Sequence, residues 1–570
     1  MKSTILSRRD LDFLLYEWLQ VEELTARPRF AEHSRETFDG VLDLCEQLAE
    51  RYFAPHNKLS DAHEPTFDGT TVTVIPEVGE ALQAFAKADL LGMGFDAALG
   101  GAQLPATVAQ AGFAWISAAN VSTSGYLMLT IANANLIAKF GSPEQISQWV
   151  TPMLAGRFTG TMALSETQAG SSLADITTRA EPQADGSYRV FGTKMWISGA
   201  EHELTDNIVN LVLAKIPGGP AGTKGISLFI VPKFLVDADG SVGTRNQVAI
   251  SGLNHKMGQR GITNTVLNFD GATGYLVGEP HRGLVYMFHM MNEARLGVGM
   301  GAVALGYTGY LKSLEYARER PQGRLVKDPS APQVPIIAHA DVKRMLLAQK
   351  AYVEGALGLA LYCARLVDVE DTELLDILTP VAKSWPSQWC LEANSLAIQV
   401  LGGYGYTREY DVEQHYRDNR LNPIHEGTHG IQSLDLLGRK VTQGGGASLA
   451  ALGERIAATV AAAGDHEFGV ALDAAWQRLV EVTAGMFASG DVEAAMANSA
   501  VYLEAFGHIV IAWIWLEQFL AAGDHAGDFY DGKRQAARYF FHYELPKTAP
   551  QLELLASLDR TTLEMAPDWF

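Results

Sequence analysis

The chain has 570 residues, and its 44 lysines and arginines against 65 aspartates and glutamates give a formal net charge of −21 at pH 7. Hydrophobic residues make up 47% and charged residues 19% of the sequence, which provides for a large core and excludes wholesale disorder. The acidic excess argues against nucleic acid or an anionic membrane as the main partner, because both require a basic surface.

The cysteines and the apolar stretches bear on the compartment. Cys45, Cys363 and Cys390 are far apart and form no Cys-x-x-Cys pair, which argues against a disulfide framework or a cysteine-based zinc site. The first residues show no apolar signal-peptide core, and we find no stretch of the ~20 apolar residues that a transmembrane helix needs. We therefore expect a cytoplasmic protein with no transmembrane segment.

Residues 1–157 are predicted to form an N-terminal helical domain. Residues 122–140 are apolar and rich in small side chains, as in a buried helix, whereas residues 94–104 form a glycine-rich break. Apolar residues recur at helical spacing at Leu11, Leu14, Leu15, Trp18 and Leu19, and again at Leu42, Leu44, Leu48 and Tyr52.

Residues 158–278 are predicted to form a small all-β domain, either a barrel or a sandwich. Short runs that favour strands occur at 188–192, 208–214, 225–231 and 265–269. Turn signals such as Asp185-Gly186 separate them, and strands at this spacing are typical of small β domains.

The remainder is predicted to be helical, so the expected fold class is α+β. Residues 279–441 contain long helical stretches at 284–320, 339–367 and 374–401, which indicates a C-terminal four-helix bundle. Residues 442–448 (TQGGGAS) are typical of a linker. Residues 449–570 are alanine-rich and predict an additional α-helical C-terminal domain.

One short motif resembles a dinucleotide site but has the wrong context. Gly299, Gly301 and Ala304 loosely match Gly-x-Gly-x-x-Ala. A dinucleotide fingerprint needs a strand before it, and here the helical pattern runs through the motif without a break. Small residues on one helix face more often allow another helix to pack closely, and we favour that interpretation.

Residues 425–429 (HEGTH) formally match the zinc motif His-Glu-x-x-His. In a zinc protease both histidines share one helix face. Here Pro423 and Gly427 oppose a helix through the motif, and Thr428 is typical of the N-cap of a helix that begins after it. We therefore expect no metal at this site.

A third segment offers more chemistry. Residues 161–178 (TMALSETQAGSSLADITT) form a loop rich in Ser, Thr and Gly, and KMWIS follows at 194–198. Hydroxyl and backbone N–H groups suit a polar heteroaromatic ring and phosphates. Trp196, beside a strand, is placed to stack on a planar cofactor.

Five blocks in this order resemble the acyl-CoA dehydrogenase family over about residues 35–440. They are ALSETQAGSSLADITTRA from 163, KMWISGA from 194, KMGQRGITNT from 256, EYARERPQGR from 315, and QVLGGYGYTREYDVEQHYRDNRLNPIHEGTHGIQ from 399. The helical tail resembles the large bacterial subgroup with an extra C-terminal helical domain, which includes methylthiopropionyl-CoA dehydrogenase-like enzymes.

The resemblance implies roles for individual residues. Glu426 falls on the catalytic base; some relatives place the base just before Arg295, but Ala294 stands there, with Glu293 one residue out of register. His425 replaces a tyrosine beside the base, and it either tunes the base or is a neutral packed histidine. The implied cofactor-binding residues are Met162, Leu164, Ser165, Ser171, Trp196, Ser198 and Thr428, with Arg320, Gln399 and Gly403 reaching the FAD of a neighbouring subunit; Ser171 and Arg295 are the implied substrate contacts.

The resemblance implies FAD-dependent α,β-dehydrogenation of an acyl-CoA thioester to trans-2-enoyl-CoA by a homodimer, with electrons passed to an electron-transfer flavoprotein. Two alternatives remain open. An acyl-CoA oxidase would share the fold and the base and differ in reoxidation by O₂. A DNA-associated, weakly catalytic relative would require a basic C-terminal face, whereas residues 449–570 carry few Lys and Arg among many Asp and Glu.

Overall fold

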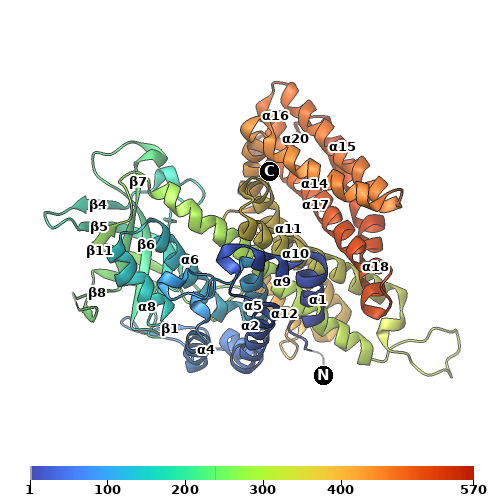
Figure 1. The fold of residues 1–570 in the computed structure, drawn as a ribbon, viewed down its shortest axis with the longest axis horizontal. Coiled ribbons are helices and arrows are strands. Elements are labelled where there is room, and N and C mark those ends of the chain that lie inside the picture. The colour runs from blue at the N-terminus through green and yellow to red at the C-terminus, as the bar shows by residue number, and fades with distance from the viewer. Residues whose placement is uncertain (1–2, 238) are drawn as a thin grey trace. The chain divides into compact units, whose positions relative to one another are not determined.

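The computed structural model describes residues 3–237 and 239–570. Helices and strands are segregated along the chain, which confirms the α+β class. The chain divides into two compact units (Figure 1). The first, called the β unit here, contains residues 35–104 and 115–297; the second, called the bundle unit, contains the residues up to Ser34, residues 105–114 and residues 298–570.

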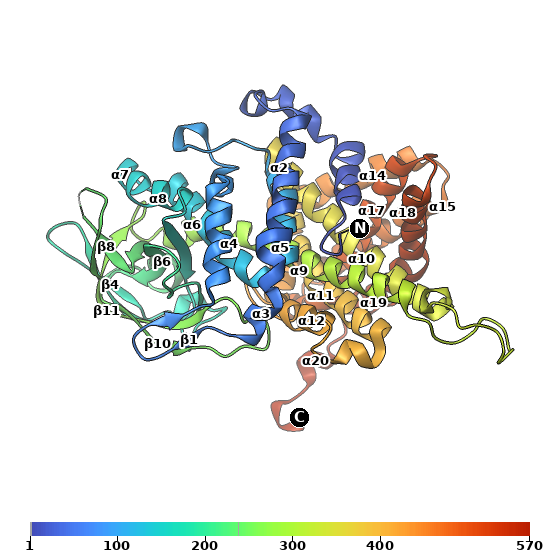
Figure 2. The same ribbon diagram turned by 90° about the horizontal axis from the view of Figure 1, so that it is seen from below.

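The helices of the β unit cover one part of its sheet. Helix α6 packs against strand β3, and α4 packs against α6 (Figure 2). The side chain of Asn120 caps α6 by accepting a hydrogen bond from the backbone N–H of Thr123, which confirms the predicted buried helix. The helices are α2 (Arg35–Leu48), α3 (Asn57–Ala62), α4 (Pro76–Lys87), α6 (Val121–Phe140), α7 (Pro143–Gln145) and α8 (Thr151–Leu154).

The N-terminal region also contains a small hairpin where only helices were expected. Strands β1 (Thr66–Phe67) and β2 (Val72–Thr73) pair antiparallel. The carboxylate of Asp68 accepts hydrogen bonds from the backbone N–H groups of Thr70 and Thr71, both at 2.8 Å. Gly69 supplies the positive φ of +99° that this turn requires.

The sheet of the β unit closes into a small barrel. β11 pairs with both β5 and β7, β5 with β4, and β6 with both β4 and β7. β3 adds to β6 in parallel, and β10 extends β11. All four predicted strand runs are confirmed. The strands are β3 (Phe158–Ala163), β4 (Arg179–Pro182), β5 (Tyr188–Ser198), β6 (Asn207–Lys215), β7 (Ile226–Pro232), β10 (Val248–Leu253) and β11 (Asn264–Leu276), with a separate pair β8 (Phe234–Val236) and β9 (Val242–Arg245).

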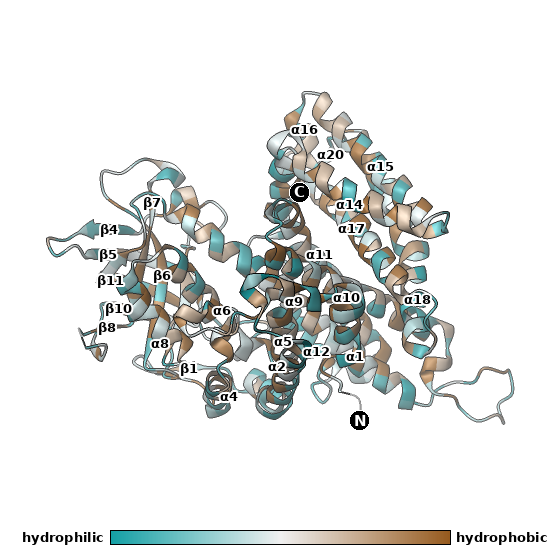
Figure 3. Ribbon diagram, viewed as in Figure 1, coloured by the Kyte–Doolittle hydropathy of each residue, from teal (hydrophilic) through white to brown (hydrophobic). Residues whose placement is uncertain are grey.

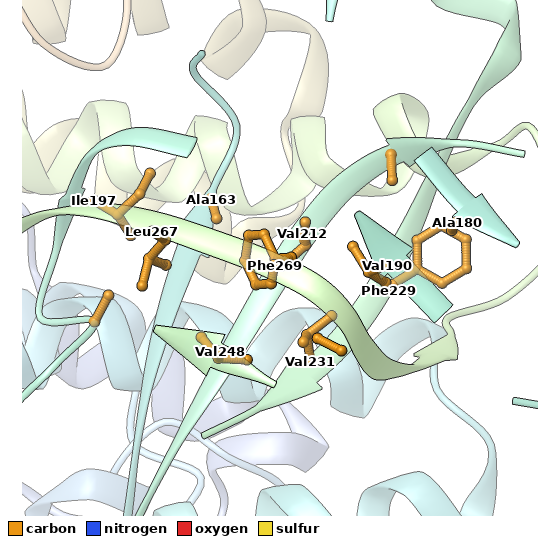
Figure 4. Close-up of a cluster of buried hydrophobic side chains, with 13 residues drawn as sticks. Ala163, Ala180, Val190, Ile197, Val212, Phe229, Val231, Val248, Leu267 and Phe269 are labelled. Atoms are coloured by element: carbon orange, nitrogen blue, oxygen red, sulfur yellow. The ribbon is translucent and has the colours of Figure 1, made fainter. Parts of the chain in front are cut away.

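Side chains from most of these strands fill the barrel. Phe229, Phe269 and Val212 are buried together, with Val190 and Leu267 in the same cluster (Figure 4). At ~25 cal/mol per Å² of apolar surface removed from water, such a core contributes substantially to folding. It gives the loops at the strand ends a rigid support.

The bundle unit is built on long helices. α10 and α11 pack along each other, and α12 and α13 pack against α11, which confirms the predicted bundle. The helices are α9 (Gly283–Glu319, in the bundle unit from Val298), α10 (Ala340–Val369), α11 (Thr372–Leu401), α12 (Val412–Asn419) and α13 (His429–Asp435).

The glycines of the false dinucleotide motif permit close helix packing, as the sequence suggested. A Cβ atom at Gly299 would lie 2.0 Å from the carbonyl oxygen of Ala382, so α9 and α11 touch through their backbones there. About two turns later along α9, a Cβ at Gly306 would meet the Cβ of Cys390 at 2.7 Å. No larger residue fits at either position without a shift of backbone.

The C-terminal residues form the predicted additional helical layer. Within it, α17 is long and apolar enough to cross a membrane (Figure 3). However, 83% of its most apolar window is buried inside the structure. A buried core helix passes the same test, so α17 carries no conclusion about a membrane. The helices are α14 (Ala447–Ala463), α15 (Glu467–Ala488), α16 (Val492–Ala497), α17 (Ser499–Ala522), α18 (Asp528–Tyr539), α19 (Thr548–Ala556) and α20 (Thr561–Glu564).

A buried ion cluster connects this layer to the rest of the bundle unit. Nζ of Lys533 on α18 pairs with the carboxylate of Asp10 and with that of Glu354, the latter at 3.0 Å. The hydroxyl of Tyr307 donates to Asp10 at 2.8 Å. The ions partner one another, as buried charges must.

Candidate active site

Two sequence blocks of the β unit lie side by side. β3 ends at Ala163, and the loop after it runs against β5. The backbone N–H of Met195 donates to the carbonyl of Ser165 at 3.0 Å, and the hydroxyl of Thr161 donates to the carbonyl of Ser198 at 2.6 Å. The polar loop and the KMWIS strand therefore form one surface.

A buried ion pair fixes this loop. Nζ of Lys194 lies 3.0 Å from the carboxylate of Glu166 and also donates to the carbonyl of Leu164 at 2.9 Å. Thr177 and Thr178 each donate both a backbone N–H and a hydroxyl hydrogen to Glu166. Burial opposes ionisation of Glu166, but the charge of Lys194 and these hydrogen bonds outweigh it and lower its pKa.

Thr167 and Gln168 form the tip of a tight turn. The backbone N–H and carbonyl groups of Glu166 and Ala169 bond to each other across it, at 2.9 and 3.1 Å. The side-chain amide of Gln168 returns to the Glu166 carboxylate at 2.8 Å. These two residues thus close the turn, and Gln168 adds a donor to the Glu166 carboxylate.

Trp196 is the most unusual aromatic residue of this surface. The residue is 61% exposed although it lies within β5, and its backbone has a φ of +67°. A bulky residue in the left-handed region is strained, and such strain concentrates at functional sites. An exposed indole held in this way offers a flat face for a planar ligand.

The other predicted residues of the β unit lie in varied settings. Met162 is buried in β3, Leu164 and Ser165 are half-buried in the loop, and Ser171 is exposed farther along it. The hydroxyl of Ser198 accepts a hydrogen bond from the side-chain amide of Asn264 at 3.0 Å.

Arg295 and Glu293 stand on the part of α9 that belongs to the β unit. Arg295 is buried and donates to the side-chain oxygen of Asn292 at 3.3 Å. The carboxylate of Glu293 accepts from Asn135 at 3.4 Å and lies 3.5 Å from Nε2 of His289. Burial raises the pKa of Glu293 to about 7, although the Asn135 hydrogen bond and Lys139 work against it.

In the bundle unit, Glu426 lies on the turn between α12 and α13, outside any helix. Its φ is +53°, and that of Gly427 is +89°. Thr428 caps α13, as predicted, by accepting a hydrogen bond from the backbone N–H of Ile431 at 3.2 Å. Because α13 begins only at His429, the two histidines of HEGTH do not share a helix face, and the zinc-protease geometry is absent.

A buried lysine of α11 supports this turn through hydrogen bonds. Nζ of Lys383 on α11 donates to the carbonyls of Asn422 and Gly427 at 2.8 and 2.7 Å. Burial, followed by the charge of Lys383, lowers the pKa of His425 to about 3. His425 is therefore neutral, and its Nε2 bonds to the side-chain oxygen of Asn422 at 3.0 Å.

Arg320 and Gly403 line one cavity of the bundle unit, of about 510 Å³. The Arg320 guanidinium also lies 5.8 Å from the ring centre of Tyr404. Gln399 is exposed and directly precedes Val400, one of the lining residues. Glu426 is not among the lining residues. The lining consists of Tyr316, Arg320, Gln322, Ile336, Val400, Leu401, Gly402, Gly403, Tyr404 and Thr407.

Sequence reasoning missed the supporting residues Glu166, Lys194 and Lys383. A signal existed for each lysine. Lys194 opens the KMWIS block, and Lys383 interrupts an otherwise uncharged stretch of α11 from Ile377 to Leu391. A lone charge in a buried segment demands polar partners, and the search for them leads to these loops.

Comparison with known families agrees with these observations over most of the chain. The acyl-CoA dehydrogenase N-terminal domain matches residues 36–157, the middle domain 161–272 and the C-terminal domain 281–441. The acetyl-CoA dehydrogenase C-terminal-like domain matches residues 452–566.

Individual relatives and a solved structure are similar over nearly their whole length. The 3-methylmercaptopropionyl-CoA dehydrogenase of Ruegeria pomeroyi is 35% identical over 528 residues, 89% of each chain. The broad-specificity linear acyl-CoA dehydrogenase FadE5 of Mycobacterium tuberculosis is 33% identical over 98% of each. The structure of an acyl-CoA dehydrogenase complexed with FAD from Bacillus anthracis has the same fold, with a TM-score of 0.75 at 19% identity, covering 94% of this chain and 93% of that one. The chain belongs to the acyl-CoA dehydrogenase family.

Proposed function

We propose that this chain uses FAD to oxidise an acyl-CoA thioester to the trans-2-enoyl-CoA and passes the electrons to an electron-transfer flavoprotein. The conformation of Glu426 carries the proposal. This glutamate, at the position of the family's base, lies outside any helix on a strained turn, and a hydrogen bond from Lys383 to Gly427 supports that turn. A structural surface carboxylate has no need of that support.

The residues present fit FAD. The exposed, strained face of Trp196 suits a flat ring, and the loop of Leu164, Ser165 and Ser171 supplies hydroxyl and backbone N–H groups beside it. Met162, Ser198 and Thr428 complete the assigned set. When bound, FAD supplies the acceptor for the hydride that leaves the β-carbon.

The chain's own part in the reaction is to remove a proton and to position the thioester. Glu426 takes the α-proton, which requires a carboxylate within hydrogen-bond reach of that carbon. Its backbone N–H donates to the thioester carbonyl, where negative charge develops as the proton leaves. Arg295 and Ser171 bind the substrate. His425, held neutral, adds no charge beside the base.

The cavity at Arg320 and Gly403 is assigned to the FAD of a second copy of this chain, together with Gln399. Its volume falls in the usual range for cofactor sites, and the guanidinium of Arg320 supplies positive charge for a phosphate. The protein is accordingly a homodimer.

Anaerobic titration of the FAD-loaded protein with acyl-CoA tests the proposal. We expect loss of the visible flavin band with butyryl, other linear or 3-methylmercaptopropionyl thioesters, the substrates that relatives are named for. No bleaching with any acyl-CoA would contradict the proposal. Rapid formation of peroxide in air would instead indicate an oxidase, and slow reoxidation without an electron-transfer flavoprotein supports a dehydrogenase.

A further inference from the structure

Lys383 is fully buried on α11, yet its ammonium lies against the turn between α12 and α13. It donates to the carbonyl of Asn422, which precedes Glu426, and to that of Gly427, which follows it, at 2.8 and 2.7 Å. Hydrogen bonds from a charged donor are stronger than neutral ones, and more so in a buried setting. One side chain therefore binds both ends of the six-residue turn.

The backbone between these two points is unfavourable by itself. Glu426 has a φ of +53°, in the left-handed region that residues with a side chain seldom adopt. The side-chain amide of Gln432 supports the same residue by donating to its carbonyl at 3.2 Å. A strained conformation persists only where the surroundings fix it, and here Lys383 and Gln432 do so.

The position of Lys383 is itself fixed by the packing of α11. Pro386 has no N–H, so it gives no helical hydrogen bond to the carbonyl of Ala382. At that carbonyl the backbone of α9 approaches so closely that a Cβ on Gly299 would lie 2.0 Å away. The backbones of α9 and α11 are therefore in close contact at Ala382, the residue directly before Lys383.

A chain of amides ties the far side of the turn to the same helices. His425 bonds to Asn422, and the amide of Asn422 donates to Asn419 at 2.8 Å. Asn419 donates in turn to Asn394 on α11 at 2.7 Å, and Asn394 to the carbonyl of Leu305 on α9 at 2.9 Å. The turn is thus linked to α11 through Asn394 and Lys383, and to α9 through the carbonyl of Leu305.

We propose that Lys383 is the positioning residue of the base: its bonds to the carbonyls of Asn422 and Gly427 hold the left-handed turn that aims Glu426 and the N–H of Glu426. This inference rests on the proposed role of Glu426. The charge of Lys383 has a second consequence, because an ammonium bonded to the carbonyl of Gly427, inside the HEGTH segment, repels a divalent cation and disfavours a metal there.

Lys383→Met tests this role, because methionine has a similar length but donates no hydrogen bond. With FAD bound and acyl-CoA saturating, we expect reduction ~10²-fold slower, the loss typical of a small misplacement of a catalytic group. The dissociation constant for acyl-CoA and the visible spectrum should change little. Lys440→Met is the matched control, since it removes another buried lysine of this unit, paired with Asp376, and should leave the reduction rate unchanged.

A wild-type rate in folded, FAD-loaded Lys383→Met would overturn the proposal. If that variant does not fold, Lys383→Gln replaces it, because glutamine keeps a donor for one carbonyl. We expect FAD reduction in Lys383→Gln ~10-fold slower than in wild type. A wild-type rate in this variant would also overturn the proposal.

Hydrogen–deuterium exchange separates this proposal from the role of Glu426. Residues 420–432 should exchange ~10-fold faster in Lys383→Met or Lys383→Gln, with the exchange of β5 unchanged, whether or not the protein oxidises any acyl-CoA. Unchanged exchange in 420–432 would show that Lys383 does not hold the turn. Faster exchange with normal reduction would show that it holds the turn but does not position the base.

Discussion

Two buried lysines support two loops of this protein in different ways. In the β unit, Lys194 reaches the carboxylate of Glu166, and that carboxylate is also bound by Thr177, Thr178 and Gln168. In the bundle unit, Lys383 reaches main-chain carbonyls on either side of Glu426. The carboxylate of Glu166 is thus itself the acceptor that holds its loop. Near Glu426, in contrast, the lysine binds the main chain.

This difference indicates that Glu166 has a structural role and does not act as the base. The acceptor sites of Glu166 are occupied by donors, and its lowered pKa keeps it ionised. Such a group holds no proton at neutral pH and has no open side for a substrate. Lys383, in contrast, binds the main chain on either side of Glu426 and not its carboxylate.

The sharpest contrast is between the two Glu→Gln variants. Glu426→Gln should bind FAD normally and reduce it ~10³–10⁴-fold more slowly with acyl-CoA, because a general base is lost without a change of shape. Glu166→Gln should lower the amount of bound FAD, and the enzyme that retains FAD should turn over at a rate near wild type. Rapid reduction by Glu426→Gln would place the base elsewhere, with Glu293 the first residue to examine.

Removing the lysine of the β unit tests the structural half of the contrast. Lys194→Met leaves the Glu166 charge buried with one partner fewer, which should cost ~3 kcal/mol of stability in the β unit. The pKa of Glu166 is lowered by folding, so its contribution is present above about pH 4.5 and is lost as the pH falls further.

Thermal unfolding at pH 7 and pH 4, followed through the intrinsic fluorescence of tryptophan, measures both effects. The stability gap between wild type and Lys194→Met should narrow at the lower pH. Glu181→Gln is the control, since this exposed partner of Arg179 should change stability by less than ~1 kcal/mol. A gap that is constant with pH would show that Lys194 acts without the charge of Glu166.

The sequence predicted the elements of both units well, because their periodic patterns are long. The helix expected at 374–401 is observed as Thr372–Leu401, despite Pro380 and Pro386 inside it. The strands at 188–192 and 265–269 extend to Ser198 and Leu276, since the residues beyond the apolar runs pair across β5 and β11. Local pattern identifies such elements but not where pairing ends.

The candidate site was less predictable, because its support is made of long-range contacts. Thr428 as a helix cap and Glu426 on a turn follow from neighbouring Pro and Gly residues, and both are confirmed. The hydrogen bond from Lys383 to Gly427 joins residues 44 positions apart, and the sequence next to either residue does not predict it. The roles assigned to the individual site residues, and the domain boundaries at 157, 278 and 441, remain predictions.

Trp196 offers a smaller test of the flavin surface. The residue is 61% exposed, so Trp196→Ala should change stability little, while the loss of a stacking face should weaken FAD binding ~10-fold. Trp196→Phe keeps an aromatic face and should recover most of that affinity. Dialysis against known FAD concentrations measures the affinity, and equal affinities for all three proteins would exclude stacking by Trp196.

The smallest expected effect concerns Glu293, the remaining rival to Glu426. Folding raises its pKa to about 7, so the folded protein holds a proton there that the unfolded chain releases above about pH 4.5. Stability from this group is therefore complete below about pH 4.5 and declines as the pH rises through 7. Glu293→Gln removes the decline.

The size of that effect is limited, because 36% of the Glu293 side chain is exposed and solvent screens its interactions. Relative to wild type, Glu293→Gln should melt slightly higher at pH 8 than at pH 5, by less than about 2 °C. The FAD bound to Glu293→Gln should be reduced by acyl-CoA at the wild-type rate at both pH values. A large loss of rate in Glu293→Gln, beside a small one in Glu426→Gln, would reverse the assignment of the base and remove the contrast between the two lysine-supported loops.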